Sequence, residues 1–256
     1  MKTATAIKLN QLNQHFYKKV AEHFHTSRQF YWHGWRQLLP HIKNNLNSKT
    51  QLKVLDVGCG NGRFGKFLFD TLPEQDIIYH GIDFNQSLLE HAQQNLKKTT
   101  LTFELHQLDL VEKLISDTLF STKVKKYDLI VLFGVLHHIP SYQLRKQLVQ
   151  NLSAQVAETG ILCCTLWRFI NPDNEKSTAT VDSSQVNIDQ NELEPHDYFI
   201  PWKRGVPAIR YCHFTPDFEE RRLITASGLK LRATFEADGK ESKGNRYLIL
   251  QNDNER

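Results

Sequence analysis

The sequence predicts an α/β fold built on a doubly wound, seven-stranded, mostly parallel sheet, with a helical extension at its N-terminal end. Three observations lead to this class. Strand-like and helix-like segments alternate along residues 51–256, which is typical of parallel sheets with helices on both faces. The segment Asp128–Phe133 is almost continuously apolar, as expected for a strand covered on both sides. Gly58, Gly60 and Gly62 follow the first strand and permit a tight turn into a helix.

Residues 1–50 form the predicted extension. Apolar side chains recur there at helical spacing in two groups, which are Phe16, Val20 and Phe24, then Phe30, Trp35 and Leu38. Pro40 follows the second group and is expected to end the helical region. We therefore expect one or two helices before the first strand, joined to it by a polar connector.

The remaining elements are predicted in chain order within residues 51–256. Strand patterns cover residues 53–57, 77–82, 102–107, 128–133, 161–166, 230–237 and 246–251. Helix patterns cover residues 63–72, 86–97, 141–160 and 216–226, and the third of them is expected to end at Gly160. These elements together make one doubly wound domain.

A segment of different composition interrupts this rhythm at about residues 171–197. It holds seven acidic residues and one lysine but few large apolar side chains. Such a segment cannot bury enough surface to offset the entropy lost on ordering. We expect a mobile acidic insert there.

Basic charge is concentrated near the N-terminal end. Residues 1–53 carry nine Lys or Arg against one acid, a net charge of +8, so the rest of the chain sums to −4 within a total of +4. Basic residues interleaved with aromatic ones suit a phosphate-rich partner whose bases can stack. A solvated helical face with aromatic side chains packed beneath it explains the same pattern.

Cysteine usage and hydropathy exclude other classes. The four cysteines, Cys59, Cys163, Cys164 and Cys212, form no CxxC pair and have no zinc-like spacing to histidine, so we expect neither disulfides nor a metal site. No apolar run approaches the roughly 18 residues of a membrane span. We therefore expect a cytoplasmic protein that has no membrane partner.

The run VLDVGCGNGRFG, residues 54–65, places glycines where a helix N-terminus offers free N–H groups to a ligand. Counted from Gly58, the spacing differs from the G-x-G-x-x-G of dinucleotide-binding proteins, because Arg63 stands at the position of the third glycine. The pattern D-x-G-x-G-x-G, beginning at Asp56, resembles motif I of class I S-adenosylmethionine (SAM) methyltransferases. This resemblance implies that SAM is the cofactor.

The same resemblance assigns further residues to the cofactor. Asp83, at the end of the second strand, is expected to accept hydrogen bonds from the ribose hydroxyls. Asp109, after the third strand, is expected to face the adenine amino group. The full set expected at the cofactor is Asp56, Gly58, Cys59, Gly60, Asn61, Gly62, Asp83, Phe84, Asp109, Leu110 and Phe133.

Three more segments resemble the tRNA methyltransferases that esterify 5-carboxymethyluridine at the wobble position. They are Tyr17–Arg28, Ile200–Trp202 and Arg210–Phe214, which are similar to the patterns Y-x-x-V-A-x-x-F-x-x-T-R, V-P-W and R-Y-Y-H-x-F of that family. Two departures are Ser27, inserted before the arginine, and Cys212, which replaces the second tyrosine. The resemblance implies the anticodon loop of tRNA as partner, and a small activator subunit is a further partner of some relatives.

A carboxylate acceptor is already an anion at neutral pH, because its pKa is near 4. Transfer to it needs a cation or N–H donors and an aromatic wall rather than a general base. The candidate catalytic residues are His137, His138, Arg210 and His213. The candidate substrate-binding residues are Lys18, Lys19, Arg28, Arg36, Trp202 and Tyr211, with Lys203 and Arg204 on the other side of the RNA.

Other functions fit parts of the same pattern. A SAM-dependent methyltransferase that acts on a small carboxylic acid or quinone precursor would use the aromatic extension as a lid. A noncatalytic SAM-binding module would use its helices to recruit a partner. A dehydrogenase is disfavoured by the glycine spacing.

Overall fold

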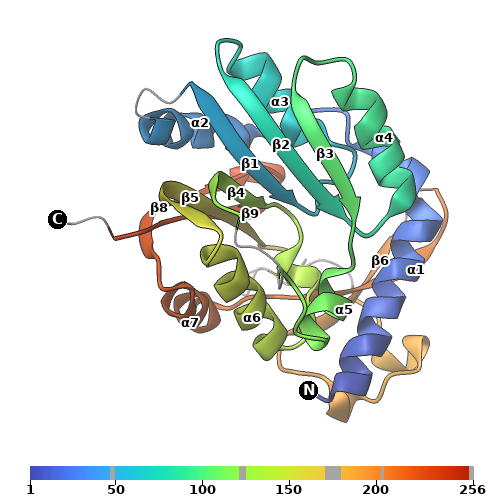
Figure 1. The fold of residues 1–256 in the computed structure, drawn as a ribbon. Coiled ribbons are helices and arrows are strands. Elements are labelled where there is room, and N and C mark those ends of the chain that lie inside the picture. Colours follow the sequence, from blue (N-terminus) through green and yellow to red (C-terminus); the bar gives the residue numbers. More distant parts are fainter. Residues whose placement is uncertain (47–49, 121–124, 171–179, 203–204, 254–256) are drawn as a thin grey trace.

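The computed structural model describes residues 1–46, 50–120, 125–170, 180–202 and 205–253. Its centre is a seven-stranded sheet in the order β3-β2-β1-β4-β5-β9-β8 (Figure 1). The strands are β1 (Gln51–Val57), β2 (Asp76–Asp83), β3 (Thr102–Gln107), β4 (Tyr127–Leu132), β5 (Val156–Trp167), β8 (Lys230–Ala237) and β9 (Asn245–Gln251), while β6 (Asp197–Trp202) and β7 (Ala208–His213) form a separate antiparallel pair. Strands β1 to β5 pair in parallel, and β9 runs antiparallel to both β5 and β8. The predicted seven-stranded, mostly parallel sheet is confirmed.

Helices cover both faces of this sheet. They are α1 (Thr3–Ser27), α2 (His33–Leu46), α3 (Arg63–Thr71), α4 (Gln86–Leu96), α5 (Leu110–Ile115), α6 (Tyr142–Ser153) and α7 (Asp217–Ser227). In β1, Leu52 and Val54 belong to the core beside α2 and α3, whereas Leu55 and Val57 belong to the core beside α5 and α6. Neighbouring side chains of a strand point to opposite faces of the sheet. Burial of each large apolar side chain contributes about 1.5–3 kcal/mol to the stability of the fold. The two cores make the fold doubly wound.

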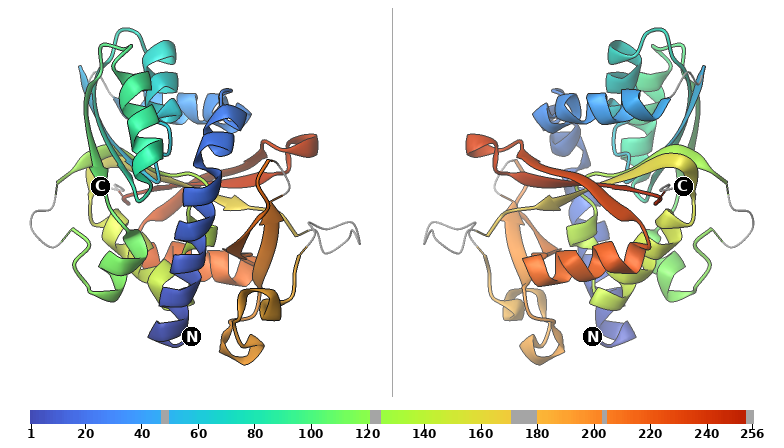
Figure 2. Two further views of the ribbon diagram at one scale, coloured as in Figure 1. Left: turned by 90° about the vertical axis from the view of Figure 1, so that its right-hand side faces the viewer. Right: turned by 90° about the vertical axis from the view of Figure 1, so that its left-hand side faces the viewer.

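The extension consists of two helices, and the first packs against the β6–β7 hairpin (Figure 2). Leu9 of α1 lies in a cluster with Phe199 and Tyr211 of the hairpin, and Phe16 lies in another with Trp202. None of the described helices, not even the 25-residue α1, combines the length and apolar character of a membrane span. The extension is therefore part of the same folded body as the hairpin.

Two predicted helix ends are wrong. Pro40 lies inside α2, where it is exposed, so the carbonyl that loses its usual N–H partner can bond to water. Gly160 lies inside β5, because α6 ends at Ser153 and Val156 is already buried in the strand. A side chain at Gly160 would come within 2.6 Å of the carbonyl oxygen of Tyr127, so this glycine permits close strand packing.

The expected acidic insert begins with residues 171–179, which lie outside the described residues. Its second half contains two short 3-10 helices, η2 (Ser183–Val186) and η3 (Gln190–Glu192). Between them, Ile188 is 6% exposed and packs beside Leu9 of α1. This half of the insert is therefore anchored by an apolar contact with the extension.

Candidate active site

A cavity of about 530 Å³ lies at the carboxyl ends of the parallel strands, where open α/β sheets bind ligands. The predicted cofactor residues that line it are Asp56, Gly58, Cys59, Gly60, Asn61, Asp83, Phe84, Asp109, Leu110 and Phe133. Four of the predicted acceptor residues line the same cavity, namely Arg28, His137, His138 and Arg210. One cavity therefore brings both groups of residues together.

The loop between β1 and α3 turns on three glycines with left-handed backbone, with φ of +75° at Gly58, +54° at Gly60 and +73° at Gly62. A side chain at Gly58 would meet Val135 at 2.2 Å. Nothing lies within 4 Å of the position that a side chain would take at Gly60. Gly62 is the N-cap of α3 and does not line the cavity. Gly60 thus leaves space beside bare backbone for a ligand, while the other two glycines shape the turn.

Asp83 ends β2 and holds the glycine loop in place. Its Oδ2 accepts a hydrogen bond from the N–H of Gly60 at 2.9 Å, and its Oδ1 accepts one from the N–H of Asn85 at 2.9 Å. Burial raises the pKa of this carboxyl, and the backbone donors oppose that shift. Backbone donors, including the N–H of Phe84, thus use most of its acceptor capacity, and a carboxylate can accept about four hydrogen bonds, so Asp83 can still accept from a hydroxyl.

Asp56 lies at the end of β1, beneath the loop. It accepts a hydrogen bond from the hydroxyl of Tyr79, and burial raises its pKa to about 7. Its carboxyl is committed to this internal contact, although it also borders the cavity.

Asp109 connects the main domain to the extension. As the N-cap of α5, it accepts at Oδ1 from the N–H of Glu112 at 3.0 Å. Its Oδ2 accepts from two side-chain amides of α1, those of Asn10, at 2.8 Å, and of Gln14. The acid expected to face an adenine amino group is therefore also a point at which α1 is fixed, and Oδ1 keeps one lone pair for a further donor.

Two arginines stand at the glycine-loop end of the cavity. The guanidinium carbon of Arg63 lies 5.3 Å from the ring centre of Trp32 and 5.1 Å from that of Trp35. Arg63 donates to the carbonyl of Phe30 at 2.8 Å and forms no ion pair among the described residues. Burial, followed by the charge of Arg28, lowers the pKa of Arg63 to about 10. Two neighbouring cations make this end suitable for an anionic group.

Arg210, on β7, stands at the other end of the cavity inside a ring of aromatic side chains. Its guanidinium carbon lies 4.7 Å from the ring centre of Trp167, 5.3 Å from that of Phe16 and 5.9 Å from that of Trp202. Its Nε is shielded from solvent, and within the described ranges this side chain has neither a hydrogen-bond partner at Nε nor an ion pair. Aromatic faces stabilise a cation only in part, so Arg210 can bind an anion that enters the cavity.

Two histidines follow β4 on a short 3-10 helix, η1 (Leu136–His138). Nδ1 of His138 lies 3.0 Å from the carbonyl oxygen of Tyr211, and its Nε2 lies 2.9 Å from the hydroxyl of Tyr17. Because a carbonyl can only accept, we assign the proton to Nδ1, and Nε2 accepts from Tyr17. His138 thus fixes a residue of α1 to a residue of β7.

Both imidazoles are neutral near pH 7. Burial, followed by the charge of Arg210, lowers the pKa of His138 to about 3. Burial, followed by the charges of His138 and Arg210, lowers the pKa of His137 well below its usual value. Neither histidine is suited to remove a proton from an acceptor at neutral pH.

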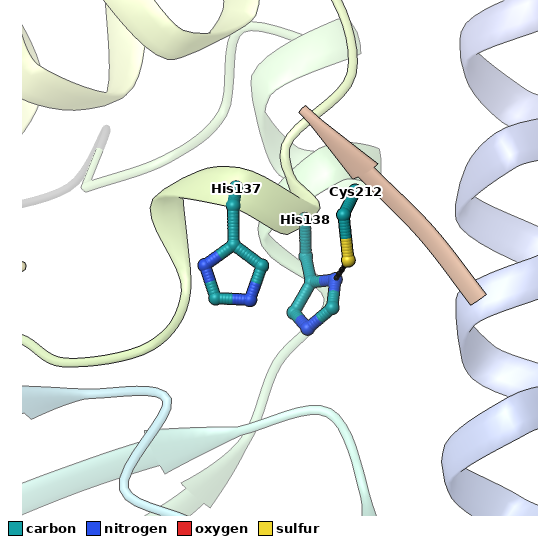
Figure 3. Close-up of side chains that lie close together, drawn as sticks. All are labelled: His137, His138 and Cys212. Atoms are coloured by element: carbon teal, nitrogen blue, oxygen red, sulfur yellow. Dashed lines mark hydrogen bonds between the residues drawn. The ribbon is translucent and has the colours of Figure 1, made fainter. Parts of the chain in front are cut away.

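His137, His138 and Cys212 each have a potential metal-ligand atom within 4.8 Å of the others (Figure 3). This donor set does not suit a metal ion. Nδ1 of His138, 3.8 Å from Sγ of Cys212, already donates to a backbone carbonyl. Burial raises the pKa of the Cys212 thiol to about 12, and a metal would also face the charge of Arg210. His137 and His138 line the cavity, and Cys212 lies behind them.

Three residues expected to touch the acceptor lie behind this wall and do not line the cavity. Trp202 forms one side of the aromatic ring described above. The hydroxyl of Tyr211 donates to Asp197 at 2.7 Å. His213 is 1% exposed, with Nδ1 2.8 Å from Asp197 and Nε2 3.1 Å from Glu219. Their positions indicate support of β7 rather than contact with an acceptor.

The remaining predicted RNA contacts lie apart from the cavity. Lys18, Lys19 and Arg36 are exposed and do not line it. Lys203 and Arg204 lie outside the described residues. Binding of RNA by these side chains stays a prediction.

Asn13, Tyr17, Trp32, Arg63 and Trp167 are among the cavity-lining residues that sequence reasoning did not assign. Tyr17 and Trp32 belong to the basic, aromatic extension, whose composition was the available signal. Arg63 enters the sequence argument only as a departure from a glycine pattern, although it directly follows the loop at a helix N-terminus. Asn13, which accepts from the N–H of Tyr211 at 2.8 Å, carries no signal in the sequence.

The fold and the glycine loop define the class of protein. Residues 55–162 match the family model described as a methyltransferase domain. The structure resembles a SAM-dependent methyltransferase from Clostridium acetobutylicum, with a TM-score of 0.63 and 13% identity over 93% of this chain and 97% of that one. It also resembles one from Methanosarcina mazei, with a TM-score of 0.61 and 16% identity over 83% of this chain and 97% of that one. Residues 55–162 thus match a methyltransferase domain, and the chain has the fold of SAM-dependent methyltransferases.

Curated relatives share part of this domain. The chain is 31% identical over 124 residues to the ubiquinone biosynthesis O-methyltransferase of Histophilus somni, which is 48% of either chain. It is 32% identical over 105 residues to the enzyme of the same name from Pasteurella multocida, covering 40% of this chain and 42% of that protein. The chain thus spans about half the length of the curated relatives it matches.

Proposed function

We propose that this protein transfers the methyl group of SAM to a carboxylate and that the acceptor is 5-carboxymethyluridine at the wobble position of tRNA. The observation that carries the reaction type is Arg210, which is enclosed by aromatic rings and has no ion pair among the described residues. An acceptor that brings its own negative charge would complete this end of the cavity.

The electrostatics of this end favour a carboxylate over a neutral acceptor. A guanidinium and a carboxylate form short, charge-assisted hydrogen bonds, each contributing about 1.5–3 kcal/mol. A neutral alcohol would leave Arg210 unpaired and would also need a base. His137 and His138 do not meet that need, because their pKa values lie far below neutrality.

The other end of the cavity fits the cofactor. The open space at Gly60 admits the methionine half beside bare backbone. Arg28 and Arg63 would hold the carboxylate of that half, Asp83 the ribose hydroxyls and Asp109 the adenine amino group. This assignment moves Arg28 from the predicted RNA surface to the cofactor.

Bound SAM would supply a methyl carbon for attack by a carboxylate oxygen. The bond from that carbon to sulfur would break and leave S-adenosylhomocysteine, and no proton would have to be transferred. The protein's part is therefore placement and exclusion of water. Arg210 would fix the acceptor carboxylate, and Trp167 would provide a flat wall for the uracil ring. Tyr17 and His138, bonded to each other at 2.9 Å, would hold the opposite wall rigid.

The choice of tRNA rests on the resemblance of three separate segments to wobble-uridine methyltransferases. Their residues gather around this acceptor end, since Tyr17 bonds to His138 and Trp202 stacks on Arg210. The net charge of +8 within residues 1–53 supports a polyanionic partner. These observations support tRNA over a small acid as the source of the carboxylate.

The test is nucleoside mass spectrometry of tRNA incubated with the protein and SAM. We expect a nucleoside heavier by one CH₂ group that reverts on mild base hydrolysis, as a methyl ester should. The matched control is Arg210→Gln, which should bind S-adenosylhomocysteine like the parent but form the ester far more slowly. Failure of the parent to modify a tRNA pool that contains 5-carboxymethyluridine would contradict the proposal.

The curated relatives favour a second candidate, O-methylation of a phenolic ubiquinone precursor. A phenol has a pKa near 10 and must lose its proton during transfer. The charge of Arg210 would assist that loss, but both histidines are weak bases, because burial lowers their pKa values. Methylation of a phenol but not of tRNA, at a rate that rises with pH, would establish this candidate instead.

A further inference from the structure

Phe30 lines the cavity although its side chain is 85% exposed. Trp32, two residues further on, also lines the cavity and is half-buried. We infer that Phe30 and Trp32 form a stacking platform for the nucleobase next to the acceptor nucleotide. The inference rests on the proposed function, because it requires an RNA acceptor.

The platform is already fixed in place. Arg63 donates to the carbonyl of Phe30 at 2.8 Å and lies with its guanidinium 5.3 Å from the ring centre of Trp32. The N–H of Gly34 donates to Asp238 at 3.0 Å, which ties the following turn to the end of the sheet. A ligand that stacks here does not have to order the backbone first, so little conformational entropy opposes binding.

Isolated exposed aromatic side chains are common on proteins and need no explanation. Phe30 and Trp32 differ because both line the same cavity and stand two residues apart in the chain. Arg36, exposed on α2 four residues after Trp32, adds a cation to this segment that the proposed function does not assign to the cofactor. Aromatic faces interleaved with cations are typical of sites for single-stranded nucleic acid, whose bases stack while the backbone is neutralised. An aliphatic tail would gain nothing from the cations.

The platform would separate two neighbouring nucleotides. The acceptor uridine would enter the cavity as far as Arg210, while the adjacent base would remain at the rim on Phe30. Stacking at the rim would offset the loss of stacking within the loop when the acceptor base leaves it.

The experiment is a cycle between one protein variant and one RNA variant. The protein change is Phe30→Ala, and its matched control is Phe218→Ala, which alters an exposed phenylalanine on α7 away from the cavity. The probes are a synthetic anticodon stem-loop and the same RNA with an abasic site beside the wobble position. Fluorescence anisotropy gives each dissociation constant, and calorimetry with S-adenosylhomocysteine checks that every variant is folded.

We expect Phe30→Ala to weaken binding of the intact RNA about tenfold, the effect of losing one base–aromatic stack. The abasic RNA should bind the parent about equally weakly, and Phe30→Ala should not weaken it further. Phe218→Ala should behave like the parent. Affinity for S-adenosylhomocysteine should stay unchanged throughout.

Several results would overturn the inference. If the parent binds and methylates RNA but Phe30→Ala matches Phe218→Ala, the platform is wrong and the proposed function stands. If Phe30→Ala remains sensitive to the abasic site, the stacked base lies elsewhere. If the parent neither binds nor methylates RNA, both proposals fail. If Phe30→Ala weakens binding of a prenylated phenol instead, the rim belongs to a small-molecule acceptor.

Discussion

Arg145, on α6, is fully buried and donates hydrogen bonds to Glu219 at 2.7 Å, to Glu194 at 3.2 Å and to the carbonyl of Ile139 at 3.0 Å. Arg210, on β7, is enclosed by three aromatic rings and forms no ion pair among the described residues. Arg145 is fully buried and Nε of Arg210 is shielded from solvent, but among the described residues the protein supplies counter-charges only to Arg145.

The difference in ion-pair partners distinguishes Arg145, which stabilises the fold, from Arg210, which can bind a ligand. Removing a charge from water costs several kcal/mol unless a matched charge replaces the solvent. Around Arg145 the chain provides that match, and the contacts join α6, α7 and the segment before β6. Around Arg210 the ring faces offset part of the cost, and an incoming anion can offset the rest. Buried cations are therefore best sorted by their partners rather than by their burial.

The largest expected effect is on stability at the paired arginine. Replacement of Arg145 by Met leaves Glu219 and Glu194 without their cation, so the free energy of unfolding should fall by about 3–5 kcal/mol. The same change at Arg210 should alter it by about 1 kcal/mol or less, since lost ring contacts are balanced by relief of an unpaired charge. Urea denaturation measures both. Equal destabilisation by the two variants would show that Arg145 and Arg210 do not differ in their contribution to stability.

The next largest effect is on activity at the unpaired arginine. Arg210→Gln should lower kcat/KM for the acceptor by about 30-fold to several thousand-fold, equivalent to about 2–5 kcal/mol for a desolvated ion pair. Binding of S-adenosylhomocysteine should stay within about twofold of the parent. Arg210→Lys should recover only part of the loss, because a point charge cannot reproduce the two-pronged contact. A variant with normal kcat/KM would show that the acceptor carries no anion at this position.

A smaller effect is expected at the cofactor end, where Arg63 also stands against aromatic rings without an ion pair among the described residues. Arg63→Gln should weaken S-adenosylhomocysteine about 10- to 150-fold, as loss of a charge-assisted hydrogen bond predicts. Binding of 5′-methylthioadenosine, which has no carboxylate, should hardly change. Calorimetry measures the affinity for both ligands. An equal loss of affinity for the two would mean that Arg63 only shapes the pocket.

The smallest expected effect is that of pH on kcat/KM. Burial lowers the pKa of His138 to about 3, and a carboxylate acceptor has a pKa near 4, so neither changes protonation between about pH 6 and 9. We therefore expect neither group to make kcat/KM depend on pH over this range, so a change near pH 7 would point to Asp56, whose pKa is raised to about 7, whereas a phenol would give a rate that rises with pH. The same lowered pKa makes the fold less stable as the pH falls below about 6.5, because only the unfolded chain then takes up the proton.

The strand pattern and the glycine spacing predicted the sheet, because buried parallel strands leave continuous apolar runs such as Asp128–Phe133 in the sequence. Two helix ends were misjudged, since Pro40 and Gly160 are governed by exposure and by packing space, which a sequence does not display. The β6–β7 hairpin was not foreseen either, as its pairing depends on contacts with α1.

The residues of the candidate site also differ in how well the sequence predicted them. Residues at or just beyond the end of a strand, such as Asp83 and Gly60, line the cavity, because all parallel strands end at one edge. Residues from distant segments were harder to judge. His213 carried the chemistry of a catalytic group, yet Asp197 and Glu219 occupy both of its ring nitrogens. Only the tertiary structure distinguishes a histidine with two acidic partners from one that faces a cavity.

Helix α1 contacts the cavity at two places. Asn10 and Gln14 of α1 bond to Asp109 near the expected adenine position, while Tyr17 and Asn13 bond to His138 and to the backbone of β7 at the acceptor end. A substitution in the middle of α1 would therefore disturb cofactor and acceptor together, because one continuous, packed helix carries the contacts of both sites.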